Sequence, residues 1–237
     1  FFSDKFYIRK YIKKKNKELS RFWKTNILKE NIDFKKIEKK EKIDSVSTNS
    51  KKIKNNQIFV GLKGKNFNGS DFADQSIQNN VKYCIVDKYG KYHQKKIVVS
   101  NPLKTLTDLS NKIREVSNIK TIAITGSAGK TSFKELLAQT LSKIDSTYYA
   151  KNSFNNKFGV PISLFNLNKK ANFGIFEIGM SKKGEIRNLT KIVKPDIAII
   201  TNVSSAHLEN FKNIGGIALA KSELIDELSK NSILILN

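Results

Sequence analysis

Residues 121–144, TIAITGSAGKTSFKELLAQTLSKI, decide the fold prediction. The apolar run TIAIT is typical of a buried strand, and the segment SFKELLAQTLSKI has the apolar spacing of an amphipathic helix. A glycine-containing turn between a strand and a helix can surround phosphate oxygens with backbone N–H groups at the helix N-terminus. The stretch therefore predicts a nucleotide-binding loop rather than an ordinary turn.

This loop departs from the commonest phosphate loop, G-x-x-x-x-G-K-[ST]. The position of the first glycine is held by Ile124, and Gly126 lies only three residues before Gly129. The chemistry survives the shortening, because Lys130 can still reach the β- and γ-phosphates and the Thr131 hydroxyl can bind Mg²⁺. The residues expected to contact the nucleotide are Thr125, Gly126, Ser127, Ala128, Gly129, Lys130, Thr131 and Ser132.

Buried strands alternate with helices through residues 119–237. We expect strands in FGIFEIG, DIAIIT and ILILN, the last of them buried, and a helix in IALAKSELIDELSK. Such alternation is typical of a mostly parallel sheet with helices on both faces. This part therefore reads as an α/β domain of the P-loop ATPase type, with its sheet incomplete at the C-terminus.

Residues 43–118 have a different pattern, with shorter apolar runs, and we interpret them as a smaller α/β domain. QIFVGLKG, YCIVD and KIVVS are short β-rich runs, and NPLKTLTDLSNKIREVS is helical in pattern. Between them, SDFADQSIQNN is helix-like, and its Ser70 and Asp71 suit an N-cap. The single cysteine, Cys84, excludes an internal disulfide and is expected to be a small buried core residue.

The composition argues against membrane-spanning, secreted and nucleic-acid-binding proteins. The 237 residues are 39% hydrophobic, enough for a buried core, and no run approaches the ~18 apolar residues of a membrane-spanning helix. The N-terminus has no apolar signal-peptide core, so we expect a cytoplasmic protein. The 44 Lys and Arg residues outnumber 21 Asp and Glu, but only four are Arg, which does not favour nucleic-acid recognition.

The two ends of the chain suggest that it is part of a longer protein. Met180 is its only methionine, and it stops in the strand-like SILILN. Residues 1–42 form a lysine-rich extension, which we interpret as a solvated helix or a disordered segment without an assigned role.

The shortened loop TGSAGKT resembles the ATP loop of the Mur ligases, the ATP-dependent amide-forming enzymes of peptidoglycan synthesis. Four further segments are similar to one member, which adds D-alanyl-D-alanine to UDP-N-acetylmuramoyl-tripeptide. They are STNSKKIKNNQIFVGLKGKNFNGSDF, NSFNNKFGVP, EIGMSKKGEI and ITNVSSAHLENFKNIGGIALAKSEL. The resemblance covers roughly residues 43–237, which divide into a UDP-substrate domain (43–118) and an ATP-binding domain (119–237).

The resemblance implies catalytic roles for Lys130 and three other residues. Glu177 matches the glutamate that binds Mg²⁺ near the γ-phosphate, and His207 matches a histidine associated with a second metal. Lys221 matches the lysine that is carbamylated in many Mur ligases, which makes it a carboxylate-like metal ligand. The implied metal set is therefore Thr131, Glu177, His207 and carbamylated Lys221, with ATP and Mg²⁺ as cofactors.

The resemblance also implies two substrate-binding segments. Asn152, Asn155 and Asn156 resemble a stretch that lies between ATP and the muramoyl-peptide, and Thr48, Asn49 and Ser50, with the turn 63–70, resemble the region that holds the uridine diphosphate. Two positions depart from the family pattern. The sequence Asn49-Ser50-Lys51 stands where the family usually has D-S-R, and Ser70 stands where a histidine is common, so Lys51 offers a point charge without the arginine fork.

The implied reaction activates the tripeptide carboxylate as an acyl phosphate, which the dipeptide amine then attacks. A full member carries a third domain after the central sheet, so we expect little or no turnover from this chain alone, and a monomer. Other candidate functions are a related ligase that adds the third amino acid or polyglutamylates folate, a P-loop binding module without synthesis, and a basic nucleic-acid binder. The A-H-L-E and E-x-G-x-x-x-x-G-E-I patterns favour the dipeptide-adding member.

Overall fold

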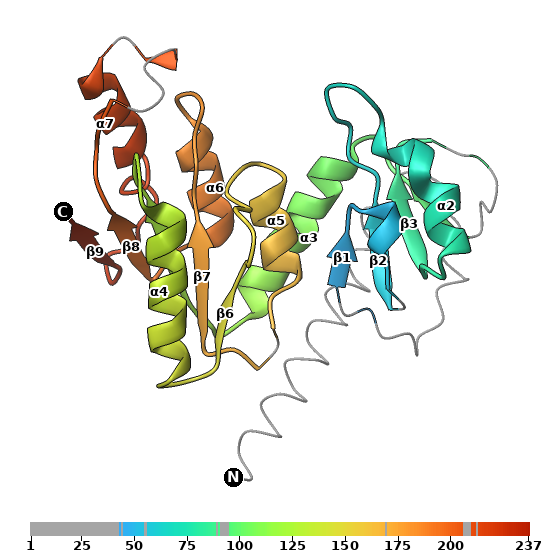
Figure 1. The fold of residues 1–237 in the computed structure, drawn as a ribbon, viewed down its shortest axis with the longest axis horizontal. Helices are drawn as coiled ribbons and strands as arrows, with labels where there is room; N and C mark the ends of the chain where they lie inside the picture. The colour runs from blue at the N-terminus through green and yellow to red at the C-terminus, as the bar shows by residue number, and fades with distance from the viewer. Residues whose placement is uncertain are drawn as a thin grey trace. The chain divides into compact units, whose positions relative to one another are not determined.

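The computed structural model describes residues 43, 45–54, 56–88, 90, 95–168, 170–205, 210–211 and 213–237 (Figure 1). They form two compact units, divided in the chain between Ile113 and Arg114. The extension predicted for residues 1–42 lies outside the described residues. The domain boundary that the sequence predicts between residues 118 and 119 stays a prediction.

The first unit is built on a four-stranded sheet in the order β1-β2-β3-β4, in which every neighbouring pair is parallel. The strands are β1 (Ser45–Ser47), β2 (Gln57–Val60), β3 (Tyr83–Val86) and β4 (Lys96–Val98). The helices are η4 (Ser50–Lys52), η5 (Gly69–Phe72), α2 (Ala73–Gln78) and α3 (Pro102–Val116), of which residues 114–116 are assigned to the second unit. The α/β architecture predicted for this part of the chain is confirmed.

Cys84 lies in the core of the first unit, as predicted. It is fully buried and packs with Phe59 of β2 and with Ala73 and Ile77 of α2. Burial raises the pKa of its thiol to about 12, so the reactive thiolate is scarcely populated at neutral pH. Cys84 is therefore a packing residue.

The cap predicted before α2 is wrong. Neither Ser70 nor Asp71 caps a helix; instead the side chain of Asn68 accepts a hydrogen bond from the Ser70 N–H (3.0 Å) and caps η5. The Ser70 hydroxyl is buried, where it donates to the Gly61 carbonyl (3.4 Å) and accepts from the Asp87 N–H (3.1 Å). Because Ser70 satisfies these buried backbone groups, it is not available as a cap.

The second unit is built on a five-stranded parallel sheet in the order β6-β7-β5-β8-β9. The strands are β5 (Lys120–Thr125), β6 (Thr147–Tyr149), β7 (Phe173–Glu177), β8 (Ile197–Ile200) and β9 (Ile233–Leu236). The helices are α4 (Lys130–Ser142), α5 (Gly159–Phe165), α6 (Glu185–Val193) and α7 (Ile214–Ser222). The sequence placed α7 too far toward the C-terminus, at residues 217–230.

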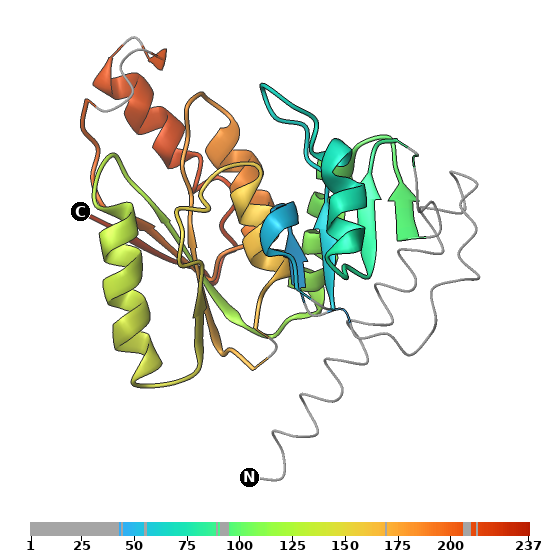
Figure 2. The ribbon, with the colours of Figure 1, turned by 45° about the vertical axis from the view of Figure 1, so that its right-hand side comes forward.

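The side chains of the central strand β5 alternate between two cores. Ile122 and Ile124 pack with Ala138 of α4 on one face of the sheet. On the other face, Ala123 packs in a cluster with Val160 of α5 and Leu189 of α6. Figure 2 shows α4 on one side of the sheet and α5 and α6 on the other. The predicted parallel sheet with helices on both faces is confirmed.

The strand predicted at the C-terminus forms, but the prediction that it is buried is wrong. Ile233 is 57% exposed and Leu236 is 60% exposed. β9 is the edge strand of the sheet and pairs with β8 on one side, which leaves its other edge and much of its faces open among the described residues. None of the described helices combines the length and apolar content required for a bilayer crossing.

Candidate functional site

The loop between β5 and α4 depends on its two glycines. Gly129 is the N-cap of α4 and has a φ of 76°, in the left-handed region that favours glycine. A Cβ added at Gly126 would lie 1.9 Å from the hydroxyl oxygen of Thr201, the residue after β8, so only glycine allows Thr201 to approach here. The two glycines therefore permit the tight turn and the close packing that the shortened loop needs.

Lys130 is the first residue of α4 and lies over this loop. Its ammonium donates hydrogen bonds to the carbonyls of Gly126 (2.7 Å) and Ser127 (3.4 Å). Burial lowers the pKa of Lys130, and the nearby Glu177 carboxylate opposes that shift. The first N–H groups of a helix have no intrahelical partner and carry a partial positive charge, so this end of α4 can bind an anion.

Glu177 is the last residue of β7 and pairs in register with Ile124 of β5, just before the loop. Its carboxylate is 4% exposed and accepts hydrogen bonds from the Thr131 hydroxyl (2.9 Å) and the Asn155 amide (2.7 Å). The structure thus brings together three residues that the sequence assigned to the site from three distant segments. Ligands of open α/β sheets bind at these carboxyl ends of strands.

Lys134 is a buried member of this cluster that sequence reasoning missed. Its ammonium is 3.7 Å from Glu177 Oε2 and donates to the Asn152 carbonyl (3.2 Å), and its side chain is 1% exposed. It lies one helical turn after Lys130, which places both on neighbouring positions of α4. That spacing was the only signal available in a chain so rich in lysine.

The segment 152–159 is folded against the end of β7. The Asn155 carbonyl accepts from the Gly179 N–H (2.7 Å), while the Asn156 side-chain oxygen accepts from the Gly159 N–H (3.0 Å) at the start of α5. Any Cβ at Gly159 would lie 2.5 Å from the Phe154 Cα atom. The oxygen of Asn156 is thus used in shaping this turn, whereas Asn155 is directed to Glu177.

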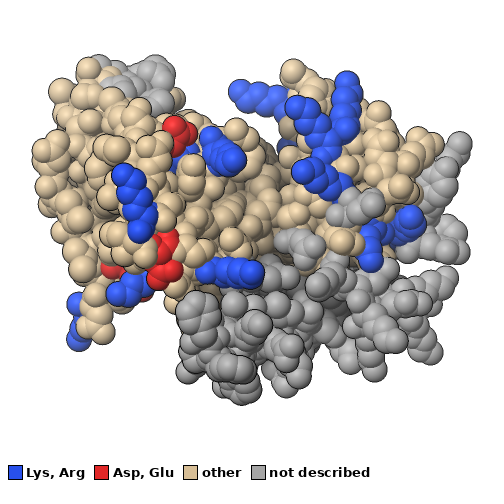
Figure 3. Space-filling model, turned by 60° about the horizontal axis from the view of Figure 1, so that its bottom comes forward, with Lys and Arg blue, Asp and Glu red and all other residues tan. Residues whose placement is uncertain are grey.

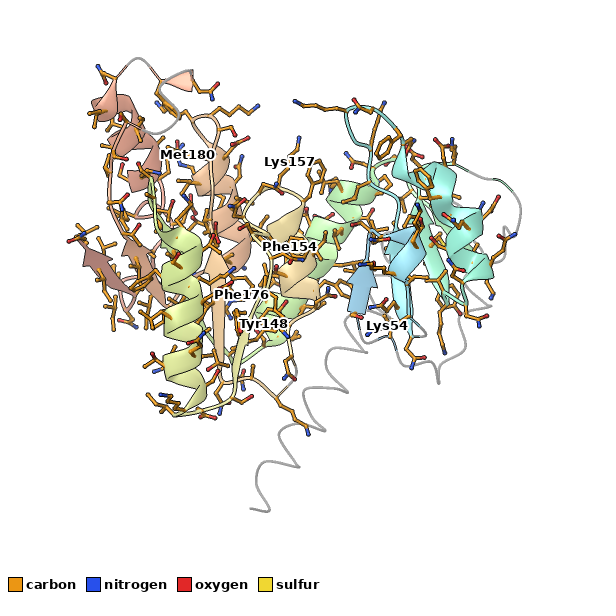
Figure 4. All side chains as sticks on the ribbon, in the orientation of Figure 1. Lys54, Tyr148, Phe154, Lys157, Phe176 and Met180 are labelled. Atoms are coloured by element: carbon orange, nitrogen blue, oxygen red, sulfur yellow. The ribbon has the colours of Figure 1, made fainter. Side chains whose placement is uncertain are left out.

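Tyr148 anchors α5, the helix that follows this segment. Its hydroxyl donates to the Ser163 carbonyl (2.7 Å), and its ring centroid is 6.2 Å from that of Phe176 in β7 (Figure 4). Burial raises the pKa of Tyr148. These contacts fix the position of α5 on the sheet and thereby the segment that carries Asn155.

Lys221 lies buried on α7. Burial lowers the pKa of its ammonium to about 8, and repulsion by Lys130 adds to the shift. Two residues later, the buried carboxylate of Glu223 accepts from the N–H groups of Gly184 (2.7 Å) and Arg187 (3.2 Å). Glu223 was not predicted from the sequence, and it holds the end of α7 against the start of α6.

Five further residues were assigned to the site from the sequence. His207 lies outside the described residues. Thr125 is fully buried, and Thr48, Asn49 and Ser50 belong to the first unit. There, the Asn49 side chain accepts from the Lys51 N–H and the Ser50 hydroxyl donates to Gln75.

In the described part of the chain, His, Cys, Asp and Glu form no group of three that could hold a metal ion. Figure 3 shows, on one face, Lys and Arg side chains among a larger number of uncharged residues. Basic side chains on a surface attract anions through their charge.

Comparison with protein families identifies the chain. A model of the Mur ligase middle domain matches residues 124–237, and a model of the Mur ligase family catalytic domain matches residues 42–140. The chain belongs to the Mur ligase family. The two matches together run from the start of the first unit through the phosphate loop to the end of the chain, so both described units are Mur ligase domains.

Individual relatives carry the names of one member of the family. The UDP-N-acetylmuramoyl-tripeptide–D-alanyl-D-alanine ligases of Buchnera aphidicola subsp. Baizongia pistaciae, Rickettsia prowazekii and Escherichia coli are 38%, 39% and 33% identical to this chain. Each match covers 82% of this chain and 43% of the relative. The chain therefore spans less than half the length of these relatives.

Solved Mur ligase structures have the same fold. MurF from Acinetobacter baumannii superposes with a TM-score of 0.75 at 33% identity, covering 82% of this chain and 43% of that one. MurF from Thermotoga maritima in complex with ADP gives a TM-score of 0.74 at 31% identity, covering 82% and 45%. These two MurF structures therefore share the fold of the region in which the family models match this chain.

The buried pair of Lys134 and Glu177 predicts a large loss of stability when one charge is removed. Lys134→Met leaves the Glu177 carboxylate buried without its cation, which should lower the free energy of unfolding by about 3 kcal/mol. Lys134→Met combined with Glu177→Gln removes both charges and should recover more than half of that loss. Urea titrations followed by circular dichroism measure both. A Lys134→Met variant within about 0.5 kcal/mol of the wild type would contradict the pairing.

The lowered pKa of Lys221 predicts a pH-dependent contribution to stability. The folded-state pKa of about 8 lies below the ordinary value of 10.5, so between these values the unfolded chain binds more protons than the folded one. Stability from this group should therefore rise as the pH increases from 8 to 10. We expect the wild type to gain stability over this range relative to Lys221→Met, measured by urea titration. A constant difference between the two would show that Lys221 titrates normally.

Proposed function

We propose that this chain supplies the UDP-substrate-binding and ATP-binding parts of a cytoplasmic ligase that adds D-alanyl-D-alanine to UDP-N-acetylmuramoyl-tripeptide in peptidoglycan synthesis. The observation that carries the proposal is the hydrogen bond between Thr131 and Glu177, which joins a phosphate loop to a carboxylate at the end of the adjacent strand. The relatives named above support the choice of substrates. In this assignment residues 43–118 bind the UDP-substrate and residues 119–237 bind ATP.

The nucleotide site is proposed at the loop and the start of α4. Backbone N–H groups from Gly126 to Thr131 would surround the phosphates, and the Lys130 ammonium would turn from the loop carbonyls toward the β- and γ-phosphates. The Thermotoga maritima relative, whose structure contains ADP, supports a nucleotide at this fold. Lys130 would then balance negative charge as the γ-phosphoryl group is transferred.

Mg²⁺ is proposed beside Thr131 and Glu177. Their hydroxyl and carboxylate oxygens are 2.9 Å apart and match the oxygen ligands that this hard cation prefers. When bound, Mg²⁺ neutralises charge on the phosphate oxygens during transfer. Asn155 holds the other oxygen of Glu177, so the carboxylate has a fixed orientation before any cation binds.

Lys221 is proposed as the carbamylated lysine, and His207 as its partner at a second metal. The neutral amine is the form that reacts with CO₂, and a pKa of about 8 increases the neutral fraction near neutral pH. The ammonium first loses one proton to give the amine. The amine nitrogen then bonds to the carbon of CO₂ and loses a second proton, so that a cation is converted into an anionic carbamate. That change would remove the repulsion between Lys221 and Lys130.

The proposed reaction has two steps and needs no protein nucleophile. A carboxylate oxygen of the tripeptide attacks the γ-phosphorus, and ADP leaves. The amine of D-alanyl-D-alanine then attacks the acyl carbon, phosphate leaves, and the nitrogen loses a proton to give the amide. Asn155, together with Asn152 and Asn156, would orient the muramoyl-peptide with amide donors and acceptors. The protein's task is to position two anions and screen their repulsion.

Phosphate release by the complete gene product tests this function. With ATP and Mg²⁺, release should require both UDP-N-acetylmuramoyl-tripeptide and D-alanyl-D-alanine, and omission of either should abolish it. Lys130→Ala should lower the rate about 100-fold or more. Lys143→Ala, an exposed lysine at the far end of α4, serves as the matched control and should have no effect. Release that ignores both substrates would contradict the ligase.

A further inference from the structure

The phosphate loop is hydrogen-bonded to the segment that follows β8. The Thr201 N–H donates to the Thr125 carbonyl (2.9 Å), and the Ser127 N–H donates to the Asn202 carbonyl (3.0 Å). The pairing of β8 with β5 therefore continues past the ends of both strands.

Asn202 makes the densest set of contacts with the loop. Its side-chain oxygen accepts from the N–H groups of Ser127 (3.1 Å) and Ala128 (2.9 Å), and its amide nitrogen donates to the Ala128 carbonyl (3.2 Å). A carboxamide is required for this combination, since a carboxylate cannot donate and a hydroxyl is too short to span the set. One half-buried side chain thus fixes two consecutive peptide groups of the loop.

Two neighbouring hydroxyls complete the support. The Thr201 hydroxyl donates to the Ala128 carbonyl (3.0 Å), and the Ser127 hydroxyl donates to the Ser204 carbonyl (3.1 Å) while accepting from the Ser204 N–H (2.8 Å). Every residue between the two loop glycines is therefore bonded to the segment 201–204. The loop and this segment form one hydrogen-bonded unit.

We propose that Asn202 is a positioning residue for the nucleotide, an inference that rests on the proposed ATP site. By satisfying the N–H groups of Ser127 and Ala128, Asn202 leaves the N–H groups at the start of α4 to bind phosphate. It also fixes the turn at Gly129, which directs those N–H groups. The role differs from that of Lys130 and Thr131, because Asn202 acts on the loop and not on the phosphate itself.

The test measures ADP affinity of the 237-residue chain by isothermal titration calorimetry in the presence of Mg²⁺. Asn202→Ala removes all three side-chain hydrogen bonds and should weaken ADP binding about ten-fold or more. The matched control is Asn172→Ala, which loses one amide hydrogen bond to Asp145 (2.7 Å) just before β7, at the opposite end of that strand from Glu177, and should bind ADP as the wild type does.

Asn202→Asp preserves the size and shape of the side chain and gives a second, independent measurement. The carboxylate can still accept from both N–H groups, but it repels the Ala128 carbonyl and places a negative charge beside the phosphates. ADP affinity should fall below that of Asn202→Ala at low salt, and the gap should narrow at high salt because the charge is screened. Equal ADP affinities of Asn202→Asp and Asn202→Ala at low salt would contradict the placement of residue 202 beside the nucleotide.

The outcomes separate this inference from the proposed function. If the wild type binds ADP and Asn202→Ala binds it equally well, the positioning role is wrong and the ATP site stands. Equal weakening by Asn172→Ala would also overturn the role, since it would indicate general loosening of the sheet. A wild-type chain that binds no ADP would contradict both the ATP site and this inference.

Discussion

The buried carboxylate of Glu177 constrains the packing of the second unit around the phosphate loop. A charge removed from water must be compensated by hydrogen bonds and an opposite charge. Thr131 and Lys134 supply these from α4, and Asn155 supplies the remaining hydrogen bond from the segment before α5. Satisfying one side chain therefore fixes the loop helix, the end of β7 and the predicted substrate segment together, and this ordered cluster is what the proposed chemistry uses.

The parts of the fold that are readable in the sequence are those with strong local signals. β5, β7 and β8 are mostly apolar runs, and the sequence of α4 has apolar residues at helical spacing, so their sequence patterns sufficed. α5 begins with Gly-Val-Pro, a poor helix signal, and its position depends on Tyr148, which no local pattern shows. β9 was predicted as buried because its composition is apolar, whereas burial is set by its place at the sheet edge.

The residues of the site can also be separated into those that a local sequence pattern predicts and those that it does not. The glycines, Lys130 and Thr131 are adjacent in the chain, so their phosphate-binding chemistry could be predicted locally. Glu177, Asn155 and Lys221 were identified only through resemblance to the family. Lys134, Asn202 and Glu223 were not predicted, because their roles are defined by partners in distant segments: Asn152 and Glu177, the phosphate loop, and the start of α6. No spacing rule within the sequence identifies such residues.

A crystal structure of this chain with ADP and Mg²⁺ would test the role of Glu177 most directly. The β-phosphate should lie against the N–H groups at the start of α4. Mg²⁺ should lie about 2.1 Å from the Thr131 hydroxyl, with Glu177 bound to the cation directly or through water. A nucleotide bound away from the loop, or bound at the loop with its metal on the side opposite Glu177, would contradict the central role of this carboxylate.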